Sequence, residues 1–450
     1  MMRAGLDARA VALRILTEAQ SRRIPTEPLL APTLARSGLD ARDRRLATTL
    51  VQTTHRWRGR ADRILDHRLE RGVRSLEART LNILRLAYVQ LFHLDQLPPH
   101  AVVHTAVDLA RRAGGEGKAR LVNRILRGLL AHPPGPEEWR APRGSSVGAA
   151  IVLEGELSHP AWLLERWLAR WGRSETERIC EWNNRPPRFH LRVAGGAAAA
   201  AEVAARLGAE GIDAVPGRLL PEALRLCATL DLYGHPLLAE GRVSVQDESQ
   251  MLVGRLWPPE ATGPVLDLCA APGTKSCHLA ELEPETAVFA ADAAPRRLER
   301  VRDAARRLRL GNVSCFVGDG LRPPLRPGLA RVLVDAPCSA LGVLQRRPDA
   351  RWLRSPGEIH DAARRQALLL DAAADLLVPG GFLLYSLCTL ESEESDEQVD
   401  AFLERHPGFE PAQLPAIVPE ALRDRPGIVR VLPGTLEMEG LFAALLRRKA

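Results

Sequence analysis

The spacing of apolar residues changes along the chain, and the change predicts two kinds of domain. Before about residue 135 the spacing is helical, as at Leu81, Leu84, Tyr88 and Leu91 and again, after Pro98 and Pro99, at Val103, Val107 and Ala110. From about residue 262 short apolar runs alternate with helical stretches; the runs cover residues 265–268, 287–291, 313–317, 331–335, 382–387 and 441–446. This alternation predicts an α/β domain with an open, doubly wound, Rossmann-like sheet, preceded by an all-α domain.

The residues between these two regions predict a linker and a small module. Residues 132–146 are rich in Pro and Gly and poor in apolar side chains, which favours a linker placed at 136–157. A helical run with four tryptophans then precedes an alternating strand at 188–193, a helix over 199–207 and strands near 223–226 and 242–245. We therefore expect an all-α domain at 1–135, the linker at 136–157, a small α+β module at 158–260 and the α/β domain at 261–450.

The net charge and the cysteine pattern indicate which class of partner and which cellular compartment to expect. Lys plus Arg number 62 against 55 Asp plus Glu, and the net charge of +7 favours a polyanionic partner. The seven cysteines include no Cys-x-x-Cys pair, which is typical of a reducing cytosol and argues against a disulfide scaffold or a zinc cluster. No apolar stretch is long enough to cross a bilayer, and the first residues lack a signal-peptide pattern. We expect a cytoplasmic protein with no metal and no membrane partner.

Basic residues gather in the predicted helical domain. Two interpretations remain open for them, namely contact with RNA and a solvated helix face. They are Arg56, Arg58, Arg60, Arg111, Arg112, Lys118, Arg120, Arg124 and Arg127.

Two cysteines at the ends of apolar runs are candidates for covalent chemistry. Cys338 closes the run Leu-Val-Asp-Ala-Pro-Cys, and Cys388 closes the run Leu-Leu-Tyr-Ser-Leu-Cys. A thiol at a strand end can attack an electron-poor carbon, and Asp335 is placed to hydrogen-bond the ring that the thiol activates. The alternative for either cysteine is a buried, small apolar residue.

A loop between the first apolar run and the following helix is a candidate cofactor site. Its small residues Ala270, Ala271 and Gly273 allow close backbone approach, and the N-terminus of the helix can accept a carboxylate. Lys275 in this loop is unusual, because lysine otherwise occurs only at positions 118 and 449. No phosphate-binding Gly-x-x-x-x-Gly-Lys-Ser/Thr spacing is present, which argues against ATP.

Two further acids follow the next two runs. Asp292 ends the second run, where a carboxylate can bind both hydroxyls of a ribose, and Asp319 follows the third, where an adenine amino group can be recognised. Taken singly, Asp292 could be a helix N-cap and Asp319 a turn residue.

The motifs resemble those of a known enzyme family. Leu-Cys-Ala-Ala-Pro-Gly-Thr-Lys at 268–275, Asp-Ala-Pro-Cys-Ser-Ala-Leu-Gly-Val at 335–343, Arg-Pro-Asp at 347–349 before Trp352, and Tyr-Ser-Leu-Cys-Thr at 385–389 are similar to signature segments of the S-adenosylmethionine-dependent RNA cytosine-5 methyltransferases. The helical region, with Leu-Val-Asn-Arg-Ile-Leu-Arg at 121–127, resembles the NusB-type RNA-binding domain. Their pairing is similar to the Sun-type enzymes that modify 16S ribosomal RNA.

The resemblance implies a cofactor, a partner and roles for individual residues. It implies S-adenosylmethionine as the cofactor, 16S ribosomal RNA rather than DNA as the partner, and a monomer. It makes Cys388 the nucleophile, Cys338 the residue that helps to release the product, and Asp335 a group that contacts both the base and the cofactor. The segment Gln-Asp-Glu-Ser at 246–249 is expected to lead into the catalytic domain near the flipped base. The implied cofactor contacts are Cys269, Ala270, Ala271, Pro272, Gly273, Thr274, Lys275, Asp292, Asp319 and Asp335.

Departures from the family pattern leave alternatives open. Thr274 replaces a usual glycine, Ser-Ala-Leu-Gly at 339–342 replaces Ser-Gly-Thr-Gly, and Glu-Ser-Asp at 394–396 replaces Glu-Asn-Glu. These departures concern substrate contacts more than chemistry.

Three alternative functions remain open. They are a cytosine-5 methyltransferase acting on another RNA (tRNA or 23S rRNA), a DNA cytosine-5 methyltransferase in which Cys338 attacks, and a non-catalytic RNA-binding ribosome-assembly factor.

Overall fold

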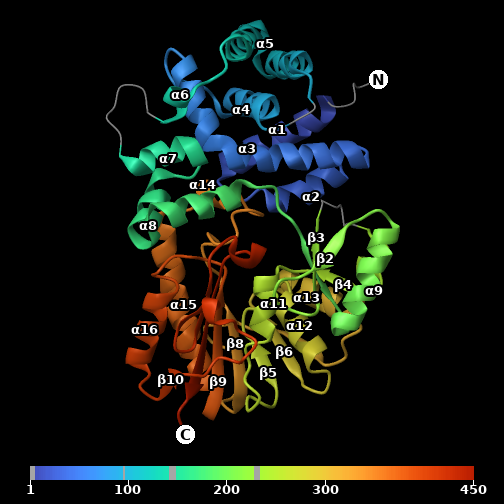
Figure 1. Ribbon diagram of the computed structural model, residues 1–450, viewed down its shortest axis with the longest axis vertical. Helices are drawn as coiled ribbons and strands as arrows, with labels where there is room; N and C mark the ends of the chain where they lie inside the picture. Colours follow the sequence, from blue (N-terminus) through green and yellow to red (C-terminus); the bar gives the residue numbers. More distant parts are fainter. Residues whose placement is uncertain (1–5, 95–96, 141–147, 228–233) are drawn as a thin grey trace. The chain divides into compact units, whose positions relative to one another are not determined.

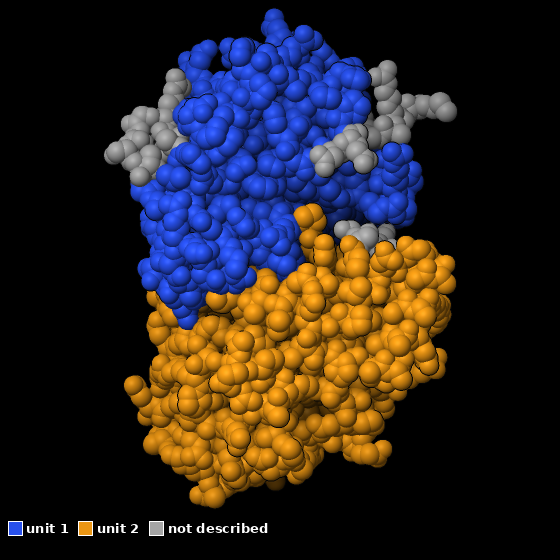
Figure 2. Space-filling model, in the orientation of Figure 1, with its two compact units in different colours: residues 1–185, 344–353 blue, residues 186–343, 354–450 orange. Residues whose placement is uncertain are grey.

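The computed structural model describes residues 6–94, 97–140, 148–227 and 234–450. The chain forms two compact units, here called the helical unit (Met1–Arg185 with Leu344–Leu353) and the sheet unit (Pro186–Val343 with Arg354–Ala450), which are coloured separately in Figure 2. Among the described residues, no helix has the length and apolarity needed to span a membrane.

The helical unit confirms the predicted all-α region. Its longer helices bury a common apolar core, to which α4 contributes an almost continuous run of buried residues because neighbours surround it on most sides (Figure 1). Asp40 caps α3 by accepting a hydrogen bond from the Asp43 amide at 2.7 Å. The helices are α1 (Leu6–Arg22), α2 (Glu27–Ala35), α3 (Ala41–Arg68), α4 (Ala78–Phe92), α5 (Pro99–Ala131), α6 (Pro136–Arg140), α7 (Ala149–Leu157), α8 (Ala161–Asn184) and α14 (Ala350–Leu353).

The stretch expected to be a linker contains two short helices and leads into a longer one. Helices α6 and α7 form within 136–157, while residues 141–147 of the expected linker lie outside the described residues. Helix α8, which the sequence places at the start of the small module, packs within the helical unit. Its apolar face is buried there, with Leu163, Leu164 and Trp167 at most 1% exposed.

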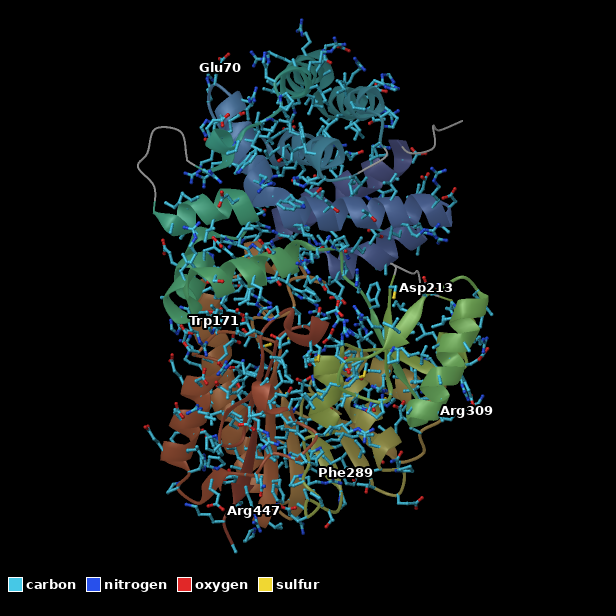
Figure 3. The ribbon with its side chains drawn as sticks, viewed as in Figure 1. Glu70, Trp171, Asp213, Phe289, Arg309 and Arg447 are labelled. Atoms are coloured by element: carbon cyan, nitrogen blue, oxygen red, sulfur yellow. The ribbon has the colours of Figure 1, made fainter. Side chains whose placement is uncertain are left out.

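The basic residues divide into two groups. Arg56 is buried, and Arg60 donates hydrogen bonds to the carbonyl oxygens of Gly155 and Glu156, so these two are internal ties. The arginines of α5, in contrast, are exposed, and nitrogen-tipped side chains stand around that helix in Figure 3. The exposed α5 arginines are Arg111, Arg112, Arg120, Arg124 and Arg127.

The sheet unit begins with the expected small α+β module. Its antiparallel sheet has the order β2-β3-β1-β4, with β1 (His190–Val193), β2 (Ala214–Pro216), β3 (Ala223–Leu226) and β4 (Val243–Val245). Helix α9 (Gly196–Ala209) packs Ala200, Val203 and Leu207 against this sheet. Short α10 (Pro236–Ala239) and α11 (Glu248–Gly254) follow.

The large sheet confirms the predicted doubly wound α/β domain. Its order is β11-β12-β13-β9-β8-β5-β6-β7. The strands from β9 to β7 run parallel to one another, whereas β9 pairs antiparallel with β13. The chain runs from β5 outward to β6 and β7 and then returns to β8 on the other side, so β5 lies at the switch point where such folds bind ligands. The parallel strands are β5 (Val265–Asp267), β6 (Val288–Asp292), β7 (Val313–Val317), β8 (Leu329–Asp335) and β9 (Leu377–Leu387).

Helices and antiparallel strands complete the large sheet. Apolar clusters cover both of its faces, as a sheet with helices on each side requires (Figure 1). Strand β13 (Leu441–Arg448) was expected, whereas β10 (Phe409–Pro411), β11 (Arg423–Arg425) and β12 (Ile428–Val431) were not. The helices are α12 (Thr274–Leu282), α13 (Pro295–Arg307), α15 (Pro356–Leu376) and α16 (Asp396–Arg405).

Candidate active site

The carboxyl ends of the parallel strands bring the chemically distinctive residues to one edge of the large sheet. In the strand order β9-β8-β5-β6-β7, these ends carry or precede Cys388, Asp335, Asp267, Asp292 and Asp319. The pairing of Asp335 with Ser386 sets the register between β8 and β9, so the loops that carry Cys338 and Cys388 leave neighbouring strands side by side. The predicted site residues are thus gathered by the topology of the sheet.

The loop between β5 and α12 is shaped for close approach. Gly273 has a φ of +102°, a conformation that side chains rarely adopt, and a Cβ there would lie 3.0 Å from Val301 of α13. Gly273 is also the N-cap of α12, and among the described residues no side chain caps that first turn. The first N–H groups of the helix are therefore available to an anion.

Asp292 is held at the side of this loop. It is 5% exposed and accepts hydrogen bonds from the amides of Ala294 at 2.9 Å and Ala271 at 3.4 Å. Arg297 approaches the same carboxylate at 3.4 Å. Asp319 has a different setting, because it is exposed and its Oδ1 accepts from the Leu321 amide at 3.0 Å, as a turn residue does.

Lys275 joins the loop between β5 and α12 to the end of β8. Its Nζ lies 2.7 Å from Oδ2 of Asp335 and donates to Oε1 of Gln250 at 2.7 Å. The Lys275 side chain is 7% exposed, whereas that of Asp335 is 32% exposed. The buried ammonium thus orients one carboxylate oxygen, while part of Asp335 stays open to a ligand.

The two candidate cysteines lie in direct contact. Their Sγ atoms are 3.4 Å apart. The hydrogen bond to Cys388, followed by burial, raises the pKa of Cys338 well above its ordinary value. The two thiols therefore share a hydrogen bond, which together with burial disfavours the charged form of Cys338. Cys269, by contrast, is a thiol whose pKa is raised to about 12 by burial.

A buried acid lies below these groups at the end of β5. Asp267 is 1% exposed, and its Oδ2 accepts from Oγ of Ser276 at 2.6 Å. Burial raises its pKa to about 7; the Ser276 hydrogen bond opposes the rise, and the negative charge of Asp335 adds to it.

The segment 246–249 builds the structure around the site. Asp247 accepts from Nδ1 of His190 at 3.0 Å and from the amides of Ser249 at 3.0 Å and Glu439 at 3.1 Å. Glu248 is buried and accepts from the amides of Arg218, Leu219 and Leu220. This segment therefore fastens the small module to the strands that follow.

Two contributors to the site were not predicted from the sequence. Gln250 follows the quoted segment directly and contacts Lys275 at 2.7 Å. Glu394 drew notice only as part of a departure from the family pattern, yet it is buried beside both cysteine loops. The sequence carries only a weak signal for Glu394, because its role follows from its contacts with Ser339 and Thr389, the hydroxyl residues that directly follow the two cysteines.

Comparison with protein families divides the chain into three matched regions. Residues 255–447 match the family described as 16S rRNA methyltransferase RsmB/F. Residues 6–131 match the NusB family, and residues 159–232 match the ferredoxin-like domain of RsmF/B-like methyltransferases.

Whole-chain relatives and solved structures agree with these matches. A probable ribosomal RNA small subunit methyltransferase B of Bacillus subtilis is 32% identical over 98% of this chain and 99% of its own. Ribosomal RNA small subunit methyltransferase B of Vibrio cholerae is 35% identical over 81% of each chain. The crystal structure of PH0851 superposes with a TM-score of 0.82 at 24% identity, covering 99% of this chain and 100% of that one, and so shares the fold. The chain belongs to the 16S rRNA methyltransferase RsmB/F family.

Proposed function

We propose that the protein transfers a methyl group from S-adenosylmethionine to carbon 5 of a cytosine in 16S ribosomal RNA, through a covalent bond between Cys388 and carbon 6 of the base. The observation that carries the proposal is the pair of sulfurs 3.4 Å apart, one on each of the two loops that leave β8 and β9. A single nucleophile needs no second thiol at this distance. An enzyme that must both form and break a sulfur–carbon bond can use two thiols, one to attack the base and one to assist its release.

The residues of the β5–α12 loop fit S-adenosylmethionine. The open N–H groups at the start of α12 suit its carboxylate, and Asp292 suits the ribose hydroxyls. We assign the cofactor contacts to residues 269–275, Asp292, Asp319 and Asp335. When bound there, the cofactor supplies an electrophilic methyl group.

The chain's own residues then divide the work on the base. The Cys388 thiolate forms a bond to C6, and the ring electrons move toward C5, which becomes nucleophilic enough to accept a methyl group. Asp335, held by Lys275, accepts hydrogen bonds from the exocyclic amine and from the N3–H of the adduct, so that the charge moved into the ring is neutralised by a proton on N3. A base, water where no side chain is placed to act, takes the C5 proton. The C5–H electron pair then restores the double bond between C5 and C6, and Cys388 leaves with the electron pair of the sulfur–carbon bond, a step that Cys338 assists. The base must leave its stack to reach these groups.

We propose roles for the other regions from their surfaces and family matches. Residues 1–135 form a NusB-like RNA-binding domain whose exposed α5 arginines contact phosphates, because Arg pairs well with that group. Residues 158–260 form a second RNA-binding module, and residues 261–450 form the catalytic domain.

Two cysteine variants test the covalent mechanism. Cys388→Ala is expected to abolish methyl transfer, because no sulfur can then attack C6. Cys338→Ala is expected to accumulate an RNA adduct that survives denaturing electrophoresis, because release is slowed. The measurement is transfer of tritiated methyl groups to 16S ribosomal RNA, with gel analysis of the protein. Full turnover by Cys388→Ala would show that the nucleophile is misassigned.

The alternatives give different results in the same assay. A DNA methyltransferase labels DNA, and an enzyme acting on another RNA labels tRNA or 23S ribosomal RNA instead of 16S. A non-catalytic assembly factor transfers no label, and calorimetry then shows no binding of S-adenosylmethionine. Bisulfite sequencing of ribosomal RNA from a deletion strain names the target cytosine.

A further inference from the structure

We propose that Glu394 is a positioning residue that holds the loops of Cys338 and Cys388 together, so that their sulfurs stay in contact during catalysis. Its importance for catalysis depends on the proposed function. Its importance for the geometry of the two thiols does not, and the two can be tested separately.

The first half of the argument is the contact between Glu394 and the Cys338 loop. Oε2 of Glu394 accepts from the amide of Ser339 at 2.9 Å, and Oε1 accepts from the Ser339 hydroxyl. Gln366 of α15 donates to the same Oε2 at 2.9 Å and to the carbonyl oxygen of Pro337 at 2.9 Å. The residues on both sides of Cys338 are therefore fixed, one by Glu394 and the other by the glutamine that Glu394 orients.

The second half is the contact between Glu394 and the Cys388 loop. The hydroxyl of Thr389 lies 3.2 Å from Oε1 of Glu394 and 2.6 Å from the hydroxyl of Ser339. One carboxylate thus contacts the residue that directly follows each cysteine. The backbone adds a tie between the same loops, because the amide of Gly342 donates to the carbonyl oxygen of Cys388 at 3.0 Å.

Burial makes this carboxylate an effective tie. Glu394, Ser339 and Thr389 are at most 2% exposed, so water does not compete well for their hydrogen bonds. Tyr385 of β9 also donates to the carbonyl oxygen of Glu394 at 2.8 Å, which fixes the backbone from which the side chain extends. The alternative is that Glu394 serves only folding stability, and the variants below separate the two roles.

Glutamine is the informative conservative substitution. In Glu394→Gln the amide oxygen can keep the Oε2 position and still accept from Ser339 and Gln366. The amide nitrogen then takes the Oε1 position and donates to the hydroxyl oxygens of Ser339 and Thr389, which can accept as well as donate. The tie survives in this variant, whereas Glu394→Ala removes it. Glu397→Ala is the control, because Glu397 is an exposed acid in the first turn of α16.

The first experiment measures the thiol geometry without RNA or cofactor. Diamide takes up the two thiol hydrogens and leaves a Cys338–Cys388 disulfide, which mass spectrometry of the linked peptides quantifies. The disulfide should form quickly in the wild type, in Glu394→Gln and in Glu397→Ala, because the two sulfurs are already in contact in these proteins. Glu394→Ala should slow the closure about tenfold or more, because the loops then move independently. An unchanged closure rate in folded Glu394→Ala would overturn the proposal.

The second experiment measures methyl transfer to 16S ribosomal RNA. Glu394→Ala should lower kcat on the order of 100-fold while leaving the KM for S-adenosylmethionine nearly unchanged, because the cofactor loop lies elsewhere on the sheet edge. Glu394→Gln should restore most of the activity. Equal losses in both variants would contradict the positioning role.

Two further outcomes are distinguishable. If no variant and no wild type transfers methyl groups but the disulfide result holds, the proposed function fails and the positioning role stands. If Glu394→Ala does not fold, Ser339→Ala and Thr389→Val each remove one hydroxyl contact and should slow closure of the disulfide to a smaller extent, whereas wild-type closure rates in both would overturn the proposal.

Discussion

At the scale of single residues, the buried carboxyl of Asp267 gives the fold a specific pH dependence. Its pKa is raised to about 7, mainly by burial, so the folded protein keeps a proton that the unfolded chain loses near pH 4. The folded state therefore binds more protons than the unfolded state between about pH 4 and 7. The stabilisation from this group is complete below pH 4 and declines as the pH rises through 7.

Asp267→Asn is expected to remove this dependence. Between pH 5 and 7 the free energy of unfolding of the wild type should contain a contribution that falls by up to about 1.4 kcal/mol per pH unit, and the variant should lack it. Urea unfolding at several pH values measures both curves. Lys275 and Asp335 are the charged groups that act on Asp267, and both remain in the variant. Parallel curves for the two proteins would contradict the prediction.

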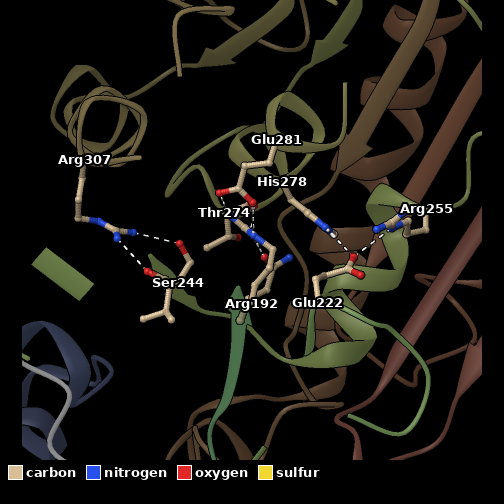
Figure 4. A network of polar contacts seen from close by, with 10 residues as sticks. Arg192, Glu222, Ser244, Arg255, Thr274, His278, Glu281 and Arg307 are labelled. Atoms are coloured by element: carbon tan, nitrogen blue, oxygen red, sulfur yellow. Dashed lines mark hydrogen bonds and ion pairs between the residues drawn. The ribbon is translucent and has the colours of Figure 1, made fainter. Parts of the chain in front are cut away.

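At the scale of elements, a buried arginine ties the small module to the cofactor loop. Arg192 of β1 pairs with Glu281 of α12 at 2.7 Å, donates to Gln246, and donates to the carbonyl oxygen of Thr274 at 2.9 Å (Figure 4). Thr274 is the first residue of α12, where the cofactor carboxylate is expected. The position of α12 is therefore coupled to β1 of the neighbouring module.

Removing Arg192 should lower the free energy of unfolding more than removing an exposed arginine. Arg192→Ala leaves Glu281, whose side chain is 13% exposed, without its partner, and should lower the free energy of unfolding by about 3–5 kcal/mol. Arg206→Ala on α9 breaks the exposed pair with Glu240 and should change the free energy of unfolding much less, because water screens that pair. Urea unfolding compares the two variants, and calorimetry should show weaker binding of S-adenosylmethionine by Arg192→Ala alone. Equal destabilisation by the two variants would argue against the tie.

The elements also show what a sequence can reveal. The parallel strands could be predicted because each is rich in apolar residues, and their carboxyl ends then located Cys338, Cys388 and the acids. The short strands β10 and β11 could not be predicted in this way, since Phe409–Pro411 contains a proline and Arg423–Arg425 has no apolar residue. The role of Glu394 was hidden for another reason, because Ser339 lies 55 positions before it and only the sheet brings them together.

At the scale of the whole molecule, a short segment from within the region that matches the methyltransferase family belongs to the helical unit. Residues 344–353 leave the sheet unit six positions after Cys338 and return to it at Arg354. Within the helical unit, Asp349 accepts from the amide of Thr26 at 2.7 Å and from its hydroxyl at 3.0 Å. Trp352 donates to the carbonyl oxygen of His55 at 2.7 Å. The sequence could not show this arrangement, since 323 positions separate Asp349 from Thr26.

The stability of the helical unit is therefore expected to depend on the chain segment that follows Cys338. Asp349→Ala in the full chain leaves two donors of Thr26 without their acceptor and should destabilise the start of α2 by about 1–3 kcal/mol. Hydrogen exchange read by mass spectrometry should show faster exchange in peptides from α2, while Asp361→Ala, an exposed aspartate of α15, should not change it. A fragment that ends at Arg185 lacks the whole segment and should unfold at a lower urea concentration than the helical unit of the full chain. If that fragment were as stable as the unit in the intact protein, residues 344–353 would not stabilise the helical unit. The regions that match the two families would then be independent modules.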